Sequence, residues 1–542
     1  MIIVIYHFTT MSLFCNSKFY RALLSFIFLL LICNYGIAQE YQYFNNRYDI
    51  SGFINQDECY KIIESNNGYI LAVSSNVLDS IVSRWEMNLT KIDNFGSVQF
   101  NQTIGDVSVD YRFPYIPRCL VKENSVYFAV GQMSTPSNSG FLDQGIIICL
   151  DEDLDTIWSR RFGEKNVPYD TSFIFTSLQC IDQNHLIVSG GWKPYGLKSH
   201  VYLLKTDTSG NQIWSRSFEY YDNYIEGYCV VQTIDYGFAV GCFKQIPGYP
   251  TSVDPVIIKT DSLGIEQWTK NVGGPYKDFI PMISIAQDGN IIIGTSYGDT
   301  MDTPDIPLSR INILKLDNDG NILWNKKYGL SQPNNFLRNI NVQNDGSIIA
   351  VGAVFKYNPN PDRIGWIFKT DANGDSLWYR EYYNLSGQDS RNYLYDVIST
   401  SDNGLIACGY VDPYPTDTGS TDTWVIKLDS IGCEFAGCDS TVGVREQGGM
   451  EAWGQGEVEV WPNPASQVIS VKSSVLISGR DYSLVVYDIF GRPAPIPDPS
   501  PTRGKGEVWW SLDVSGLPPG VYFISIVEDG RRVRGGKFVV CR

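Results

Sequence analysis

A twelve-residue pattern recurs seven times along the 542 residues of this chain and constrains its fold more than any other feature. The pattern is apolar-apolar-Lys-x-Asp-x-x-Gly-x-x-x-Trp, as in LLKTDTSGNQIW and IFKTDANGDSLW. The aligned aspartates are spaced by 54 to 58 residues, at Asp93, Asp151, Asp207, Asp261, Asp317, Asp371 and Asp429. A period of this length indicates a repeat architecture in which every unit contributes the same few elements.

A second pattern lies between these copies and consists of an alternating strand, a tight turn and a Gly-ended strand, as in SNNGYILAVSS and NDGSIIAVGAV. The Asn-Gly and Asp-Gly pairs supply the positive φ that tight hairpins need. Two strands flank this turn and two flank the Asp-x-x-Gly turn, so each unit holds four short strands. Seven such units predict an all-β fold, a seven-bladed β-propeller.

The two ends of the array predict how the ring closes. QEYQYFNNRYD at 39–49 resembles the fourth strand of a unit, whereas the last unit ends early, in CEFAGC at 433–438. We therefore expect the N-terminal strand, at about 40–49, to complete the seventh blade of a propeller that spans 39–438. Cys433 and Cys438 at this seam are candidate disulfide partners in an exported chain, with two reduced surface thiols as the alternative.

The repeated tryptophans and aspartates each allow a structural and a functional interpretation. Because the Trp recurs at one position of the unit, we expect it to fill the space between neighbouring sheets rather than to stack on a ligand. The Asp is expected to cap its turn rather than to bind calcium. An EF-type loop needs Glu eleven residues after the first Asp, and Tyr328 and Tyr382 stand there after Asp317 and Asp371. No metal and no cofactor are predicted.

The first 38 residues have the pattern of a signal peptide. Lys18 and Arg21 precede the apolar run 22–33, and Gly36 and Ala38 supply the small residues of a cleavage site. Residues 1–10 lie upstream of this pattern, which makes Met11 an alternative start. A lipid-attachment signal at Cys33 fails because bulky Ile32 precedes it. The apolar run is short for a membrane span, so we expect an exported chain without a transmembrane anchor.

The last 85 residues, 458–542, carry four motifs in order: WPNPAS at 461–466, YDIFGR at 487–492, GLPPGVYFISI at 516–526 and GGKFVV at 535–540. Short alternating strands broken by Pro and Gly predict a small β-sandwich. The segment also resembles the type A C-terminal sorting domain of type IX secretion system cargo. A generic sandwich used for binding is the alternative.

This resemblance implies the route of the protein. The signal peptide would deliver the chain to the periplasm, and the type IX machinery, as the partner of residues 458–542, would move it across the outer membrane to the cell surface or the medium. A sortase-like peptidase usually removes such a domain. Residues 439–457, rich in Gly, Gln and Glu, are predicted to form a flexible linker where processing would occur.

Composition excludes several classes of function. A net charge of −17 opposes binding to phosphate backbones, so nucleic acid is not an expected partner. The chain has three His, no Cys-x-x-Cys pair and no phosphate-binding loop. No pair of acidic residues stands out for general acid and base catalysis. The sequence therefore favours a protein that is not an enzyme.

Long, variable segments join the second and third strands of the units and collect at one end of the predicted propeller. Variable loops on a repetitive scaffold are the usual place for binding. Their aromatic residues, which could stack on sugars or anchor a peptide or instead pack against neighbouring prolines, are Trp192, Tyr195, Tyr249, Tyr276, Tyr297, Tyr357 and Tyr414. We expect a propeller that binds an extracellular glycan or protein; a glycan-degrading hydrolase or lyase with a site in the central depression is the alternative.

Overall fold

The structure is a computed structural model of the full chain. It describes residues 43–52, 55–79, 82–105, 109–137, 140–163, 171–194, 199–219, 225–245, 253–274, 276–303, 306–329, 334–356, 362–385, 390–412 and 421–434, and, near the C-terminus, 458–461, 468–473, 482–487, 502–504, 507–517, 520–528 and 531–540. Every regular element in these residues is a β-strand. The predicted signal peptide, linker and Cys438 lie outside them.

Small antiparallel sheets follow one another along residues 43–434. Four of them have four strands each: β2 (Gln56–Ser65), β3 (Gly68–Asp79), β4 (Val82–Ile92) and β5 (Val98–Ile104); β11 (Thr171–Asp182), β12 (His185–Pro194), β13 (His200–Asp207) and β14 (Gln212–Phe218); β15 (Ile225–Gln232), β16 (Phe238–Gln245), β17 (Val253–Thr260) and β18 (Glu266–Asn271); β19 (Met282–Ile285), β20 (Ile291–Thr303), β21 (Ile306–Leu316) and β22 (Ile322–Tyr328). A fifth sheet has β6 (Asp110–Arg112) and β7 (Leu120–Glu123) side by side on β8 (Val126–Ser137), followed by β9 (Gly140–Leu150) and β10 (Thr156–Phe162).

The remaining strands of this part form one eight-stranded sheet. It contains β23 (Asn334–Val342), β24 (Ile348–Lys356), β25 (Asp362–Thr370), β26 (Ser376–Tyr382), β27 (Arg391–Ser399), β28 (Leu405–Asp412), β29 (Asp422–Leu428) and β1 (Phe44–Tyr48). A single parallel residue pair, Arg363 with Arg391, joins its two halves. The N-terminal β1 pairs antiparallel with β29, from Phe44 opposite Lys427 to Tyr48 opposite Thr423.

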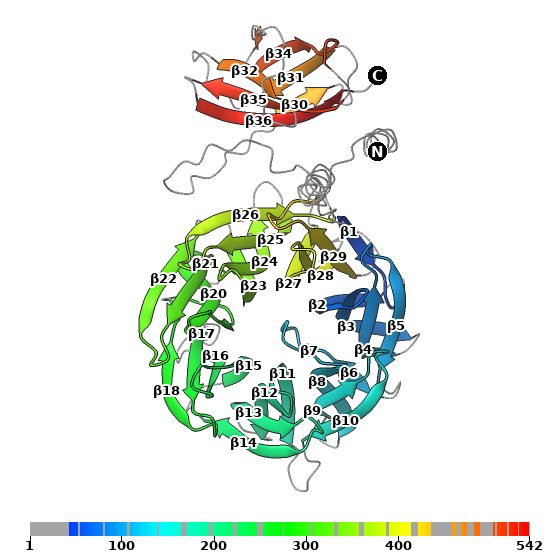
Figure 1. The fold of residues 1–542 in the computed structure, drawn as a ribbon, viewed down its shortest axis with the longest axis vertical. Helices are drawn as coiled ribbons and strands as arrows, with labels where there is room; N and C mark the ends of the chain where they lie inside the picture. Colours follow the sequence, from blue (N-terminus) through cyan, green and yellow to red (C-terminus); the bar gives the residue numbers. More distant parts are fainter. Residues whose placement is uncertain are drawn as a thin grey trace, which may run out of the picture.

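The sheets stand around a common centre (Figure 1). The first strands of the units, β2, β7, β11, β15, β23 and β27, lie nearest this centre, and the fourth strands lie at the periphery with β1 beside them. Each first strand starts at the end of the ring that carries the long connections, which we call the long-loop end. It runs toward the end with the tight turns, because each unit is an up-and-down meander.

All seven repeated aspartates cap their turns, as predicted. In each of them Oδ1 accepts backbone N–H groups from the residues two and four positions later; for Asp317 these are Asp319 at 3.0 Å and Asn321 at 2.7 Å. The residue three positions after the Asp has positive φ, which explains the repeated Gly. The second unit has Leu154 there, at φ 66°.

The repeated tryptophans pack between neighbouring sheets, also as predicted. Each lies against the turn glycine of the next unit, so that a Cβ on Gly210 would meet the Trp158 ring at 2.7 Å and one on Gly432 would meet Trp378 at 2.9 Å. Phe44 of β1 stands in the same way against Gly96 of the first unit. The glycine in the turn therefore serves both the turn and the sheet contact.

Near the C-terminus, two antiparallel sheets have the orders β30-β31-β34-β33 and β32-β35-β36. Their strands are β30 (Val458–Trp461), β31 (Val468–Ser473), β32 (Tyr482–Tyr487), β33 (Thr502–Gly504), β34 (Glu507–Asp513), β35 (Gly520–Glu528) and β36 (Arg531–Val540). Alternate residues are buried in both sheets, including Ile469 and Val471 in one and Leu484 and Val486 in the other. This alternation is that of sheets with one face packed on a core. Within the described residues, no helix is long and apolar enough to cross a membrane.

Candidate functional site

A β-bulge recurs in the first strands and directs one side chain per strand. The register against the second strand skips one residue in β2, β11, β15, β23 and β27, and the skipped residues are Tyr60, Thr176, Tyr228, Arg338 and Tyr395. A bulge of this kind re-aims a side chain and is common next to functional sites. Here it brings residues that are far apart in the sequence together around the axis of the ring.

A polar network crosses this axis. Arg118 lies in the segment before β7 and donates from Nη2 to the carbonyl oxygens of Ile283 and Ile340, each at 3.0 Å, and so connects the second unit with the fifth and sixth. Burial lowers the pKa of Arg118. Asp396 accepts from Lys61 Nζ at 2.8 Å and from Asn339 Nδ2 at 2.6 Å. Arg118 Nε is buried without a partner among the described residues, but the other named groups bond within the protein, so we regard the network as structural.

Aromatic and charged side chains lie on the long-loop side of this network, because they precede its residues in the first strands. We call Glu58, Tyr60, Tyr115, Tyr228, Arg338 and Tyr395 the axial cluster. The rings of Tyr60 and Tyr395 meet edge to face with centroids 5.1 Å apart, and the Tyr115 and Tyr228 hydroxyls are 3.0 Å apart. Tyr115 is 44% exposed, so the cluster is open to solvent at this residue.

Two carboxylates in or beside the cluster accept hydrogen bonds from tyrosines. Tyr60 donates to Glu58, and Tyr228 donates to Glu226 at 2.9 Å. Burial raises the pKa of Glu58 above its ordinary value, although the bond from Tyr60 and the charges of Arg112 and Arg338 act in the opposite direction. Burial and the adjacent Glu226 raise the pKa of Tyr228 well above its usual range. The tyrosines are therefore donors near neutral pH.

Arg338 is held by aromatic rings. Its guanidinium carbon lies 4.8 Å from the ring centre of Tyr395 and 5.8 Å from that of Phe279. Its Nε is buried and has no hydrogen-bond partner in the described part of the chain. Burial acts to lower the pKa of Arg338, but the surrounding tyrosine hydroxyls outweigh it and the pKa is raised. The group is a permanent cation with an unused donor.

Of the binding residues predicted from the sequence, the structure describes Trp192, Tyr276 and Tyr297, and none of them belongs to the axial cluster. Tyr195, Tyr249, Tyr357 and Tyr414 fall outside the described residues. Trp192 packs in the third unit against Phe173 and His200, with ring centroids 6.3 and 5.3 Å away.

Tyr276 and Tyr297 both belong to the region around β20 and come close through their backbones. A Cβ on Gly298 would lie 3.0 Å from the carbonyl carbon of Tyr276, and Lys327 Nζ stands 3.5 Å from the Tyr297 ring centre. Asp278 accepts N–H groups from Gly274 and Gly298 at 2.5 and 2.6 Å and so ties these segments together, and burial raises its pKa to about 7. This pair is half-buried, and the structure brings neither tyrosine into the axial cluster.

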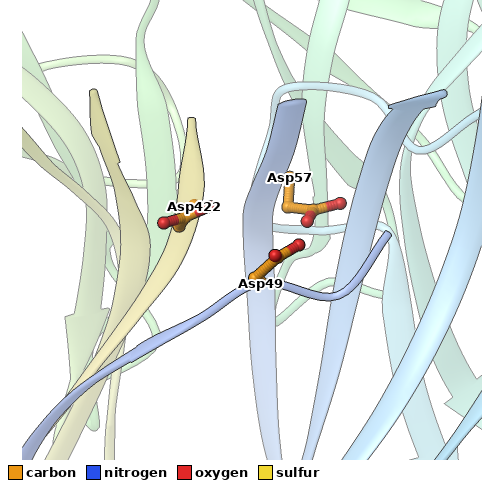
Figure 2. A group of neighbouring side chains, drawn as sticks. All are labelled: Asp49, Asp57 and Asp422. Atoms are coloured by element: carbon orange, nitrogen blue, oxygen red, sulfur yellow. The ribbon is translucent and has the colours of Figure 1, made fainter. Parts of the chain in front are cut away.

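Three aspartates gather where β1, β2 and β29 meet (Figure 2). Carboxylate oxygens of Asp49, Asp57 and Asp422 lie within 4.8 Å of one another, a spacing that a hard cation could use. However, Arg47 pairs with Asp422, and Oδ2 of Asp57 accepts N–H groups from Ile50 and Ser51 at 2.8 and 3.0 Å. Arg47 thus compensates one of the three charges and backbone groups hold one oxygen of Asp57, whereas Asp57 Oδ1 is buried without a partner among the described residues. We interpret the group as part of the seam between the first and last strands.

The cysteines and His185 have structural surroundings. Cys433 is disulfide-bonded, whereas Cys59, Cys229, Cys242 and Cys408 are free and buried. His185 Nδ1 contacts Asp182 at 2.8 Å beside the turn of its hairpin.

The C-terminal region indicates the export route of the protein. Residues 459–540 match the secretion system C-terminal sorting domain family. The sorting domain is the signal of the type IX system and indicates export to the cell surface or the extracellular space. The match covers the segment that carries the four motifs.

Comparisons of the whole chain find distant similarity. No curated protein matches the sequence. Among solved structures, an alpha-L-arabinanase from Penicillium chrysogenum in complex with arabinobiose is 12% identical with a TM-score of 0.35, over 55% of this chain and 92% of that one. A protein of unknown function from Dyadobacter fermentans is 8% identical with a TM-score of 0.37, over 72% of this chain and 96% of that one. At these scores the similarity assigns no activity.

Sequence reasoning missed the axial cluster. Four of its members are bulge residues, and the five bulge residues stand one period or two apart, in the middle of the first strands, but they differ in type: Tyr, Thr, Tyr, Arg and Tyr. A repeat is recognised when the same residue type recurs at one position of the unit. Here the position recurs, but the residue type changes from unit to unit. Variation of residue type at a fixed place in the units is the signal that would have found the site.

Proposed function

We propose that the protein is an exported binding module, carried by its sorting domain through the type IX secretion system. In this proposal residues 39–438 form a seven-bladed propeller that β1 closes by adding the outer strand beside β29. Residues 1–38 are the signal peptide, and 439–457 link the propeller to the sorting domain at 458–542. Dividing the eight-stranded sheet at its single parallel pair supports the count of seven.

The axial cluster is the proposed ligand site, and the aromatic residues of the long loops stay a prediction as further binding residues. The observation that carries this proposal is the buried Nε of Arg338, which has no partner among the described residues. An unsatisfied buried donor costs about 1–3 kcal/mol, so each one needs an explanation, and at the axis we take a ligand as that explanation. Flat tyrosine faces beside a cation suit an extracellular glycan or a peptide.

A binding screen with the secreted protein tests this function. We expect the protein to retain a subset of immobilised glycans or surface proteins without consuming them. Substituting Tyr395 by Ala should weaken retention at least tenfold, or about 1.4 kcal/mol, because the Arg338 guanidinium loses the ring beneath it. No binding to any surface component would contradict the proposal.

A glycan-degrading enzyme is the second candidate, and the Glu58–Tyr60 pair favours it. A carboxyl group with a raised pKa next to a tyrosine can act as a general acid. Turnover that Glu58→Gln abolishes while binding persists would favour the enzyme. Binding without turnover in the wild type would exclude it for the glycans tested.

A further inference from the structure

We propose that the axial cluster binds an acidic sugar residue, with Arg338 receiving its carboxylate or sulfate group. This inference rests on the proposed binding function and adds the chemical class of the ligand.

Arg338 is a cation without an acidic partner. Within the described residues it forms no hydrogen bond or ion pair, and its contacts are the faces of Tyr395 and Phe279. These ring contacts use none of the guanidinium N–H groups as hydrogen-bond donors, so the donors stay available to another group. A carboxylate or sulfate presents two oxygens at the spacing of two guanidinium N–H groups, so it can bind in a bidentate manner.

The rings beside Arg338 favour a sugar over a bare inorganic anion. Tyr115 is 44% exposed and inclined to the buried Tyr228, with centroids 6.0 Å apart. Tyr395 is buried between Tyr60 and Tyr410, with centroids 5.1 and 5.6 Å away, so Tyr115 is the ring of the cluster that offers a face to a ligand. An aromatic face accepts the apolar side of a pyranose ring, whereas a small inorganic anion gains nothing from it.

The nearby carboxylates favour a sugar over an acidic peptide. Glu58 is close enough to Arg338 for its pKa to respond to the guanidinium charge, and Glu226 lies behind Tyr228. These groups can accept hydrogen bonds from sugar hydroxyls, but they would repel a ligand with several negative charges. The net charge of −17 opposes such a ligand at longer range as well. A sugar ring with one anionic group and several hydroxyls therefore fits a site that combines one cation with neighbouring carboxylates.

The test is calorimetric titration of the secreted full-length protein with three matched oligosaccharides, ending in glucuronate, in 6-sulfated glucose and in glucose. We expect at least one of the two acidic sugars to bind ten times more tightly than the neutral one, and the two acidic arms distinguish carboxylate from sulfate. Arg338→Met should remove this preference for acidic sugars. Arg338→Lys should retain part of it, because Lys keeps the charge but lacks the paired N–H donors of the guanidinium.

Arg216→Met is the matched control. Arg216 also has a buried Nε without a partner and also lies over an aromatic ring, 5.4 Å from Trp214, but it belongs to the peripheral β14. This variant should bind like the wild type. Unfolding temperatures of both variants show whether a loss of binding reflects a loss of fold.

Several outcomes would overturn the inference. Equal affinity for acidic and neutral sugars would do so, as would an Arg338→Met variant with unchanged preference, or a tetraglutamate peptide that binds in place of the sugars. In each of these cases the proposed binding function stands. That function fails separately, if the broad screen finds no ligand of any class.

Discussion

At the scale of the residue, the repeated lysine of the motif has a role that its pattern does not reveal. It pairs with the aspartate in the hairpin turn of the same unit, in Lys259 with Asp235, Lys315 with Asp288, Lys369 with Asp345 and Lys427 with Asp402. Lys259 is the most enclosed, with a side chain that is 0% exposed, and it donates to Asp235 at 2.7 Å. The charge of the repeated lysine therefore pairs within the hairpin of its own unit.

Asp235→Asn should lower stability in a pH-dependent way. Burial opposes ionisation of Asp235, but the bonds from Lys259 and Thr233 hold its pKa well below the ordinary 3.8. An acid with a depressed folded pKa stabilises the protein above its unfolded pKa, and this contribution is lost as the pH falls. We expect a deficit of roughly 3 kcal/mol at pH 7 that shrinks below about pH 4, measured by urea unfolding across pH.

Asp288→Asn is the control for this prediction. Its partner Lys315 is 12% exposed and Asp288 itself is 51% exposed, so the pair is screened by water. The deficit should stay below about 1 kcal/mol. Equal deficits in the two variants would show that burial of the lysine does not decide the effect.

At the scale of the element, the glycines of the second strands are explained by the bulges opposite them. The sequence places these glycines near strand ends, but Gly190, Gly352 and Gly409 lie within strands, facing the bulges of β11, β23 and β27. A Cβ on each would lie 1.8 to 2.0 Å from a carbonyl oxygen of the first strand. Because glycine has no Cβ, the first and second strands can approach closely at the bulge. The bulge in turn directs the side chain of the first strand toward the axis.

The adjacent glycines of β12 provide a matched test. A Cβ on Gly190 would lie 1.9 Å from the Ile174 oxygen, whereas one on Gly191 would meet Glu226 Cγ at an ordinary 3.5 Å. Gly190→Ala should lower the free energy of unfolding by about 1–3 kcal/mol or more, and Gly191→Ala should be nearly neutral. Thermal unfolding of the two variants measures the difference, and similar midpoints would contradict this account of the bulge.

At the scale of the whole molecule, one amide crosses the seam between the first and last strands. Asn45 Oδ1 accepts from Trp424 Nε1 at 2.7 Å and from Asn384 Nδ2 at 2.9 Å, and its Nδ2 donates to the Tyr383 oxygen at 2.9 Å. Trp424 is fully buried. Asn45 therefore connects β1 with β29 and with the segment after β26.

Asn45→Ala should loosen the seam before the rest of the ring. The buried Trp424 N–H would lose its acceptor at a cost of about 1–3 kcal/mol. If β1 closes the ring as proposed, hydrogen exchange should increase in β1, β29 and β2 and remain unchanged in β15 to β18. A uniform increase over all sheets would argue against a local seam.

The sequence by itself determined the repeated units, their turn caps, the tryptophan contacts between sheets and the sorting domain. These features depend on contacts within one unit, or on contacts repeated at one period, so each leaves the same residues at the same spacing. Sequence reasoning also set the N-terminal strand beside the last unit, where β1 pairs with β29. The disulfide of Cys433 agrees with the prediction for that residue, and its pairing with Cys438 stays a prediction.

Only the tertiary structure decided which side chains become neighbours at the axis of the ring. Tyr60, Arg338 and Tyr395 come from different units, and no local pattern records which of them become neighbours. Their meeting depends on the curvature of the ring and on bulges that shift one residue per strand, which alternation in sequence does not reveal. The sequence therefore directed attention to the rim aromatics, whereas the unpartnered cation lies at the centre.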